Sequence, residues 1–128
     1  MKINASCPHF FVSDIQRSVR FYVDVLGFRE PRMWGDPPGF AKPDRDGFIV
    51  MLNQGDPEYV KPNGLNDCWD AYFWCDGVVE FFESIKDRCD VVHGPEEREL
   101  YGMREIGIRD PDGYMLVFAE DMNPQTLD

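Results

Sequence analysis

Residues 8–28, PHFFVSDIQRSVRFYVDVLGF, set the architecture, because their pattern returns in the second half of the chain. The stretch begins as an alternating strand, reaches Asp14 and continues with apolar residues at helical spacing. Asp14 suits the start of a helix, where its carboxylate accepts free backbone N–H groups, and Gly27 suits the left-handed residue that ends one. Residues 69–88, WDAYFWCDGVVEFFESIKDR, repeat this order around Asp76. The chain is therefore predicted to contain two similar units.

Further strands follow each predicted helix. The clearest are residues 47–53 in the first copy and residues 103–109 and 114–120 in the second. The last two flank the turn sequence DPDG, residues 110–113, whose proline presets a turn and whose glycine supplies a positive φ. Each copy is thus predicted to be a β-α-β-β-β unit, which makes the fold class α+β. Two such units side by side form a curved, open mixed sheet that encloses a cup.

The two copies are expected to form one domain, residues 1–128. They span about residues 7–54 and 69–120, and a linker rich in proline and glycine, residues 55–68, joins them. Within the second copy, residues 90–92 are predicted to form a short strand, followed by an acidic loop at residues 95–99. His93 is expected to be an exposed loop residue at the end of that strand.

The composition excludes several classes of function. The 128 residues carry a formal net charge of −11, so nucleic acid, which needs a basic protein face, is not expected as a partner. The same charge either attracts a cationic ligand or only keeps the surface soluble. No apolar run approaches the ~20 residues of a membrane span, and the first residues show no signal-peptide pattern. The four cysteines form no C-x-x-C pair, which favours reduced thiols and a cytoplasmic location.

Two motifs resemble the signatures of a known superfamily. The first is PxFxVxDIxxSxxFYxxxLGF over residues 8–28, and the second is GMRE at residues 102–105 followed by DPDGY at residues 110–114. They are similar to the opening and closing signatures of the vicinal oxygen chelate superfamily, which includes glyoxalase I, ring-cleaving dioxygenases and bleomycin-resistance proteins. The two motifs and the strands between them cover nearly the whole chain.

The resemblance implies four ligand positions for a divalent metal, all facing the cup. The superfamily's enzymes use His and Glu there, but this chain has Cys7, Met51, Asp70 and Val117 at the corresponding positions. Val117 offers no donor atom, and Met51 offers only a soft thioether. A site formed by Cys7, His9 and Asp70 would need two ligands spaced two residues apart on one strand, which is awkward for tetrahedral geometry. The prediction is therefore no metal, no other cofactor and no set of catalytic residues.

Alternation within the predicted strands, together with the loop after the first helix, indicates which residues line the cup. The predicted ligand-binding residues are His9, Phe11, Trp34, Phe40, Met51, Asp70, Tyr72, Trp74 and Val117. Most are apolar or aromatic, with one acidic and one imidazole group to orient a ligand, as in many small-molecule sites. Three alternatives stay open: these residues fill a closed core, Trp34 packs at a dimer contact, or His9 is a satisfied polar residue of the sheet.

Among the members of the superfamily, the resemblance is greatest to the bleomycin-resistance proteins, which are small, acidic, metal-free homodimers. It implies a small-molecule-binding protein that sequesters a cationic aromatic antibiotic without altering it, and so confers antibiotic resistance. The alternative is a metal-dependent lyase, isomerase or dioxygenase with atypical ligands. A third hypothesis is a regulatory module whose cup is filled by its own side chains. A homodimer is expected in all three cases, because exposed sheet edges are commonly covered by a twofold partner.

Overall fold

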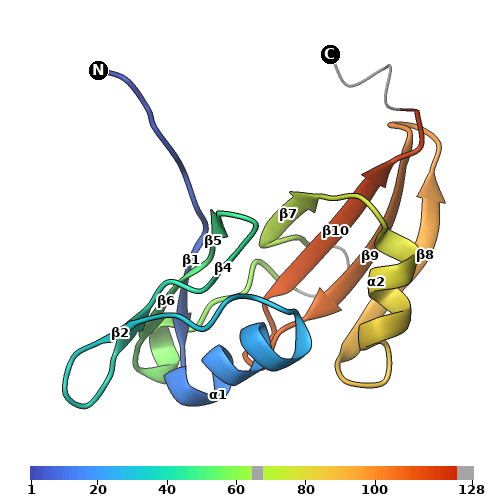
Figure 1. Ribbon diagram of the computed structural model, residues 1–128. Helices are drawn as coiled ribbons and strands as arrows, with labels where there is room; N and C mark the ends of the chain where they lie inside the picture. The colour runs from blue at the N-terminus through green and yellow to red at the C-terminus, as the bar shows by residue number, and fades with distance from the viewer. Residues whose placement is uncertain (65–67, 124–128) are drawn as a thin grey trace. The chain divides into compact units, whose positions relative to one another are not determined.

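The computed structural model describes residues 1–64 and 68–123. They belong to two compact units, Met1–Lys61 and Pro62–Asp128, called unit 1 and unit 2 below (Figure 1). The division falls inside the segment predicted to be a linker, residues 55–68. Each unit has its own open sheet and its own helix, so the α+β fold class predicted from the sequence is confirmed.

Unit 1 has a four-stranded sheet and one main helix. In sheet order its strands are β1 (His9–Val12), β6 (Met51–Gln54), β3 (Phe40–Ala41) and β2 (Met33–Trp34), and β4 (Asp44–Arg45) and β5 (Phe48–Ile49) form a separate pair. β1 is parallel to β6, and the other neighbours are antiparallel. The helix α1 (Ile15–Arg20) continues as a π-helix, η1 (Phe21–Val25), and a short 3-10 helix, η2 (Pro57–Tyr59), follows β6.

The first helix begins and ends where the sequence predicts. Asp14 Oδ1 accepts a hydrogen bond from the Arg17 N–H at 3.1 Å, which satisfies one of the free donors of the first turn. Gly27 has a φ of 75°, the left-handed conformation that ends a helix at little steric cost for glycine. The apolar side chains at helical spacing are buried: Ile15, Val19, Tyr22 and Leu26.

One strand of unit 1 differs from the prediction. The segment 47–53 was expected to be a single strand, but buried Val50 divides it. Phe48 and Ile49 pair with β4, whereas the residues from Met51 onward pair with β1 and β3. The two halves of the segment therefore belong to different sheets.

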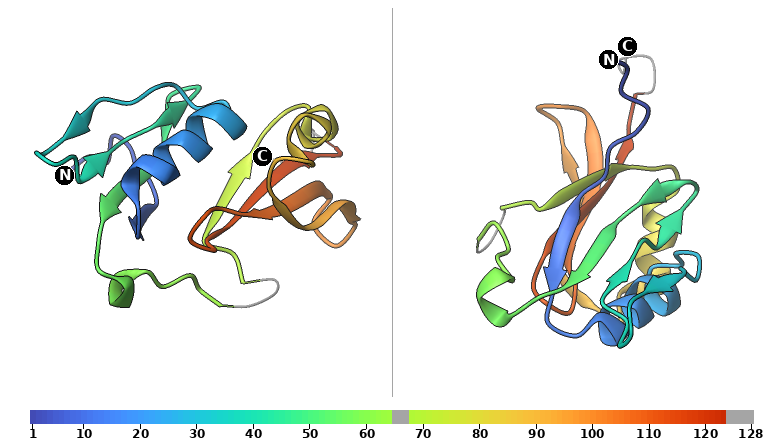
Figure 2. Two further views of the ribbon diagram at one scale, coloured as in Figure 1. Left: turned by 90° about the horizontal axis from the view of Figure 1, so that it is seen from below. Right: turned by 90° about the vertical axis from the view of Figure 1, so that its left-hand side faces the viewer.

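Unit 2 has a four-stranded sheet with a helix on one face (Figure 2). In sheet order its strands are β7 (Ala71–Trp74), β10 (Met115–Asp121), β9 (Met103–Arg109) and β8 (Asp90–Arg98). β7 is parallel to β10, and β9 is antiparallel to both of its neighbours. The helix α2 (Val78–Ile85) contacts β8, β9 and β10 and buries its first and last residues.

The helix of unit 2 begins differently from that of unit 1. Gly77, with a φ of 73°, is the N-cap residue of α2, and it has no side chain that could cap the helix. The carboxylate of Glu120 in β10 instead accepts hydrogen bonds from the Gly77 N–H at 3.1 Å and the Val78 N–H at 3.4 Å. A strand that is remote in sequence therefore satisfies the start of this helix.

The final hairpin of unit 2 confirms the predicted turn. The Gly113 N–H donates to the Asp110 carbonyl at 3.0 Å, and Gly113 has a φ of 91°. Asp110 Oδ1 also accepts the N–H groups of Asp112 and Tyr114, at 3.0 Å and 2.9 Å. The aspartate thus fixes the turn from inside, as Asx residues commonly do.

The prediction for β8 was wrong in length. The strand runs over Asp90–Arg98, so most of the expected acidic loop at residues 95–99 is paired with β9. The ladder has two register shifts, one at Val92, before His93, and one at Gly94 and Pro95, after it. β8 is an edge strand, where a proline costs no ladder hydrogen bond on its free side. His93 is correspondingly a strand residue whose side chain is only 11% exposed, not an exposed loop residue.

Within the described ranges, no helix combines the length and the apolar character needed to cross a membrane.

Candidate functional site

The strand register of unit 2 determines which side chains share a face, because directly paired residues point to the same side of a sheet. Val117 pairs with Tyr72 and with Gly107, and Ala119 pairs with Trp74 and with Glu105. The opposite face carries Phe73 and Phe118, whose rings stack at 5.0 Å, and Phe81 of α2 packs on Phe118 at 4.9 Å. The predicted residues Tyr72, Trp74 and Val117 therefore lie on the face away from α2, called the non-helical face of unit 2.

A buried carboxylate organises this face. Glu105 has no exposed surface, and its Oε1 accepts hydrogen bonds from Arg98 Nε and the Tyr101 hydroxyl, each at 3.0 Å. Its Oε2 accepts a third bond, from the Tyr72 hydroxyl at 3.1 Å. Arg98 also bridges to Glu96 Oε1 at 2.6 Å. Charge-assisted bonds of this kind are the condition under which a carboxylate tolerates burial.

The three donors around Glu105 keep their protons. Burial, and then the neighbouring Glu105 carboxylate, raise the pKa of Tyr72 far above that of a free tyrosine. Burial and the hydrogen bond to Glu105 also raise the pKa of Tyr101, and the same carboxylate raises the pKa of Arg98. At neutral pH these three groups act as fixed hydrogen-bond donors to the Glu105 carboxylate.

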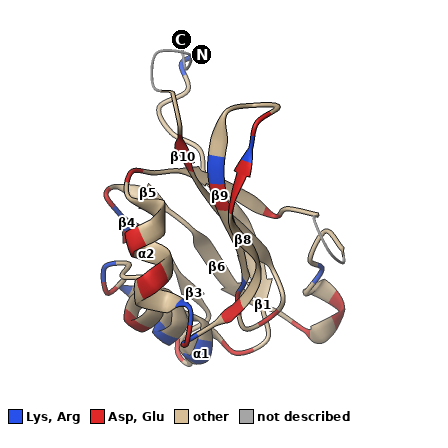
Figure 3. Ribbon diagram, turned by 90° about the vertical axis from the view of Figure 1, so that its right-hand side faces the viewer, with Lys and Arg blue, Asp and Glu red and all other residues tan. Residues whose placement is uncertain are grey.

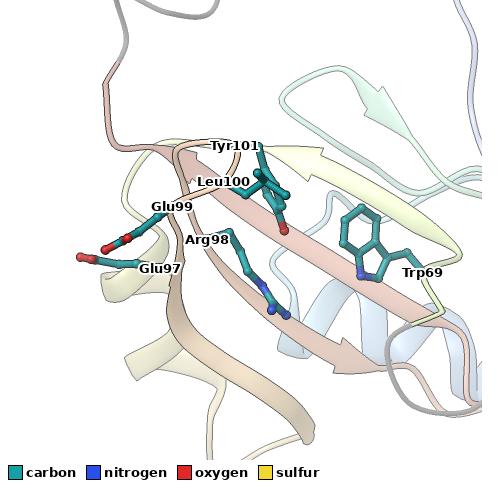
Figure 4. Close-up of a pocket in the computed structure, with 6 residues that line it drawn as sticks. All are labelled: Trp69, Glu97, Arg98, Glu99, Leu100 and Tyr101. Carbon is teal, nitrogen blue, oxygen red and sulfur yellow. The ribbon is translucent and has the colours of Figure 1, made fainter.

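An open pocket of about 440 Å³ lies beside this cluster. Its lining residues are Trp69, Glu97, Arg98, Glu99, Leu100 and Tyr101. Figure 4 shows the side chains of Arg98 and Tyr101 extending towards the side where Trp69 lies, while the carboxylates of Glu97 and Glu99 extend the other way. The pocket thus has the rings of Trp69 and Tyr101 and the guanidinium of Arg98 on one side, and the carboxylates of Glu97 and Glu99 point away from them. The charge of Arg98 is balanced by Glu96 and Glu105.

The aromatic wall continues from the pocket along β7. The Trp69 and Tyr72 rings are 4.9 Å apart, and the Tyr72 and Trp74 rings are 5.1 Å apart. Trp74 is 68% exposed, Trp69 38% and Tyr101 44%, so these rings present open π surface to solvent. Exposed indole faces are the preferred protein surface for organic cations. The wall therefore offers stacking surface for an aromatic ligand and a cation site in the same place.

The charge of unit 2 reinforces this preference. Residues 62–128 contain sixteen acidic and five basic side chains, whereas residues 1–61 contain eight of each. The whole formal charge of −11 thus belongs to unit 2. Acidic positions recur along α2 and β8 in Figure 3. A cationic ligand is attracted towards such a surface before it makes any contact.

The four positions at which the superfamily's enzymes place metal ligands do not fit a divalent ion here. Both Asp70 oxygens are already engaged, Oδ1 by the Asn63 N–H at 2.7 Å and Oδ2 by the Met115 N–H at 2.8 Å. Asp70 therefore ties two backbone segments together. Val117 is fully buried without a donor atom, and Cys7 is exposed ahead of β1.

One other group of donors in unit 2 has ligand-like spacing. His93, Glu96 and Glu105 each offer an atom within 4.8 Å of the others. His93 Nδ1 lies 3.0 Å from Glu96 Oε1 but without the geometry of a hydrogen bond, and both of its ring nitrogens are buried. The guanidinium of Arg98, however, already binds both carboxylates. In this cluster the Arg98 guanidinium occupies the carboxylates that a metal ion would need.

Sequence reasoning missed the central role of Glu105 and the burial of His93. In the sequence, Glu105 is recognisable only as part of the GMRE motif. No local pattern indicates that Tyr72, Arg98 and Tyr101 meet around it. The signal that could have located His93 is Gly107, its ladder partner. A Cβ atom at Gly107 would clash with His93 Nε2, so the glycine leaves the space that the imidazole fills.

Unit 1 also places its predicted site residues on one face. His9 pairs with Met51, and Asn53 pairs with both Phe11 and Phe40. Trp34 in turn pairs with Phe40. The face opposite to buried Phe10, Val12 and Leu52, called the non-helical face of unit 1, therefore carries all five: His9, Phe11, Trp34, Phe40 and Met51. Their role in binding stays a prediction.

His9 is exposed and partly satisfied. Its Nε2 lies 3.3 Å from Asn53 Nδ2, and its ring meets that of Phe11 edge-on at 4.8 Å. Phe11 contacts Tyr59 of η2 at 5.4 Å, so the row of aromatic rings extends past β1. This placement is compatible with either alternative for His9, a ligand contact or a polar residue satisfied within the sheet.

Comparison with known proteins gives a family and a fold. The family model of the Glyoxalase/Bleomycin resistance protein/Dioxygenase superfamily matches residues 6–118. TioX from Micromonospora sp. ML1 is 26% identical with a TM-score of 0.70, over 91% of this chain and 98% of that one. A protein of unknown function from Agrobacterium tumefaciens str. C58 is 25% identical with a TM-score of 0.66, over 94% and 96% of the two chains.

A third similar structure is a glyoxalase-related enzyme from Clostridium phytofermentans. It is 18% identical with a TM-score of 0.70, over 94% of this chain and 97% of that one, a likeness of fold alone. No curated protein matches the chain.

Proposed function

This chain belongs to the glyoxalase/bleomycin resistance protein/dioxygenase superfamily, and from that premise we propose that it is a metal-free small-molecule-binding protein. Its ligand is a cationic aromatic compound of the antibiotic kind, which it sequesters without altering. The observation that carries the proposal is the exposed aromatic wall formed by Trp69, Tyr72 and Trp74 beside the pocket, in the unit that holds all of the net negative charge.

The interactions available on this wall account for useful affinity. A cation held over a tryptophan face contributes about 0.5–2 kcal/mol, and two indoles and a tyrosine ring stand within reach of one another. Stacking of the ligand's rings buries further apolar surface at about 25 cal/mol per Å². Glu105 holds the hydroxyls of Tyr72 and Tyr101 and the Arg98 guanidinium, so the central ring of the wall and these two pocket side chains are ordered before the ligand arrives. Preorganisation of this kind lowers the entropic cost of binding.

Sequestration needs no chemical step. When the protein exceeds the ligand and the Kd is low, mass action alone lowers the free ligand concentration. The protonated tyrosines and the ion-paired Glu105 suit such a role, since none of them is poised as a nucleophile or a general base.

A second candidate function is a metal-dependent lyase, isomerase or dioxygenase with an atypical ligand set. The cluster of His93, Glu96 and Glu105 supports it, because an imidazole and two carboxylates are ordinary ligands for zinc or iron. Arg98 would first have to release both carboxylates. The two candidates differ in metal content.

The first test is a tryptophan-fluorescence titration of the whole chain with metal-free bleomycin, a cationic aromatic drug. We expect a saturable change with a Kd in the micromolar range or below, and a loss of about fivefold or more in affinity for Trp74→Ala. Phe48→Ala is the matched control, because Phe48 is 70% exposed in unit 1 and Trp74 is 68% exposed in unit 2. Equal effects of the two substitutions, or no saturation, would contradict the proposal.

The second test is the metal content of protein purified without chelator, before and after exposure to zinc, nickel, manganese and iron(II). We expect occupancy near zero, unchanged drug recovered by mass spectrometry, and no effect of His93→Ala on drug affinity. A stoichiometric metal that is lost in His93→Ala would overturn the metal-free proposal in favour of the enzyme.

We also expect a cytoplasmic homodimer. All four cysteines are free thiols, as is usual in a reducing compartment. The strands at the sheet edges, β1 and β2 in unit 1 and β7 and β8 in unit 2, leave backbone groups that a second copy can cover. Light scattering after size exclusion tests the dimer, and a monomeric mass at micromolar concentration would exclude it.

A further inference from the structure

The β2–β3 hairpin of unit 1 gathers two cations on one indole ring. Arg32 Cζ lies 5.1 Å and Lys42 Nζ 5.3 Å from the centroid of the Trp34 ring. The Trp34 ring in turn lies 5.4 Å from that of Phe40, its ladder partner. These four residues are called the Trp34 cluster below.

The cluster belongs to the non-helical face of unit 1. Side chains alternate along a strand, so Arg32 shares the face of Trp34, and Lys42 shares the face of Phe40. Arg32 directly precedes β2 and Lys42 directly follows β3, next to the Met33↔Ala41 pair, and both cations lie over the Trp34 ring. His9 and Met51 lie on the same face of this sheet. None of the residues that this register places there is acidic.

The two cations are not neutralised within the described part of the chain. Neither Arg32 nor Lys42 makes an ion pair there, although Arg20, Arg29 and Arg45 of the same unit all do. Both distances to Trp34 are near 5 Å, so their charges stand about one Debye length apart at most. Like charges at this separation repel each other, and an anion bound between them would remove that repulsion.

The rings of Trp34 and Phe40, beside the cations, favour a ligand that also has an aromatic part. Trp34 and Phe40 are both half-buried, which leaves part of each ring open for stacking. A large polyanion such as nucleic acid is disfavoured, because the chain as a whole carries −11. A small ligand with one anionic group attached to an aromatic ring satisfies both features.

We propose that the Trp34 cluster is a binding site for a small aromatic carboxylate. The carboxylate lies between Arg32 and Lys42, and its ring stacks on the exposed part of Trp34 and Phe40. This site differs in ligand charge from the aromatic wall of unit 2, so it stands or falls independently of the proposed function.

The test is a ¹H–¹⁵N NMR titration of the whole chain with sodium benzoate, observing the indole N–H of Trp34, assigned by its loss in Trp34→Phe. We expect a saturable shift that weakens at 0.5 M NaCl, because partly exposed charge pairs are screened. Benzylamine, which has the same ring and the opposite charge, should produce no saturable shift. Acetate, which lacks the ring, should bind at least about threefold more weakly than benzoate. A benzylamine response equal to that of benzoate would overturn the proposal.

Charge-matched variants complete the test. Lys42→Gln and Arg32→Gln should each weaken benzoate binding about threefold, and the double variant about tenfold. Lys2→Gln removes one positive charge from the exposed N-terminal segment and is the control. If Lys2→Gln weakens binding as much as Lys42→Gln, the effect is one of total charge and the assignment of the site is wrong. If inorganic phosphate binds as tightly as benzoate, the site reads charge alone, and the aromatic part of the proposal fails.

Discussion

The two units have sheets with the same strand order, but the side chains on corresponding positions differ in charge and polarity. The row that crosses the sheet of unit 1 from β1 to β2 reads Phe11, Asn53, Phe40, Trp34. The corresponding row of unit 2, from β7 to β8, reads Trp74, Ala119, Glu105, Glu96. In unit 1, an aromatic pair lies beside two cations that make no ion pair with the residues that the structure describes. In unit 2, a carboxylate pair is bound by one arginine. The repeated backbone specifies which positions face away from the helix, and the residue types alone decide what each face can bind.

The largest expected difference concerns the third position of these rows. Glu105→Ala removes the fully buried carboxylate that accepts hydrogen bonds from Tyr72, Arg98 and Tyr101, so the free energy of unfolding should fall by about 3 kcal/mol. Phe40→Ala, at the equivalent position of unit 1, removes a half-buried ring and should cost about 1.5 kcal/mol. Guanidinium denaturation followed by circular dichroism measures both. Equal losses would mean that Glu105 is not the organising group of unit 2.

The next difference lies at the start of the first strand of each unit. Asp70→Ala breaks two hydrogen bonds from backbone N–H groups to a carboxylate and should lower the free energy of unfolding by about 2 kcal/mol. Cys7→Ala, at the corresponding position of unit 1, changes an exposed thiol and should stay within about 0.5 kcal/mol of the parent. Urea denaturation of both variants checks the pair. A neutral Asp70→Ala would contradict the structural role of that carboxylate.

Alkaline pH should also distinguish the units. Because the pKa of Tyr72 is raised in the folded state, the unfolded chain loses that proton first as the pH rises past about 10. The contribution of Tyr72 to the free energy of unfolding is therefore complete below that pH and is lost above it. The loss is at most about 1.4 kcal/mol per pH unit, and solvent screening of the part-exposed ring makes it smaller. Tyr72→Phe should flatten this decline in stability measured between pH 9 and pH 11, whereas Tyr59→Phe in unit 1 should not. A parent protein with no alkaline decline would contradict the prediction.

The smallest difference concerns the helix starts. Asp14→Ala removes the local cap of α1 and should cost about 1 kcal/mol of unfolding free energy. Asp76→Ala should cost less than about 0.3 kcal/mol, because Glu120 satisfies the start of α2. Thermal unfolding of the two variants measures the contrast. A larger loss for Asp76→Ala would show that α2 depends on a local cap after all.

The sequence was sufficient for features that depend on local periodicity. Alternation predicted the shared faces of His9 with Phe11 and of Tyr72 with Trp74, and the bounds of β9 are those expected from the sequence. The cap at Asp14 and the turn before Tyr114 follow from short-range chemistry that any chain would obey. These features need no knowledge of which strands pair.

The features that sequence reasoning missed depend on residues distant along the chain. Pro95 suggested a loop, because its tolerance on an edge strand is visible only once the strand order is known. Glu105 acquires its role from Tyr72, which lies 33 positions earlier, from Arg98 at the end of β8 and from Tyr101 on the connection to β9. The binding role of the nine residues predicted to line the cup stays a prediction, which the ligand titrations test.

The remote cap on α2 has a consequence for the order in which the chain takes shape during synthesis. The carboxylate that satisfies the start of α2 is made 43 residues after Gly77, and β7 finds its parallel partner only in β10. Unit 1 can close its own parallel pair as soon as Gln54 has emerged. A nascent chain therefore carries a completed first unit while β7 and α2 of the second still await their partners. During that interval β7 presents unpaired backbone groups, the kind of edge that favours association between chains.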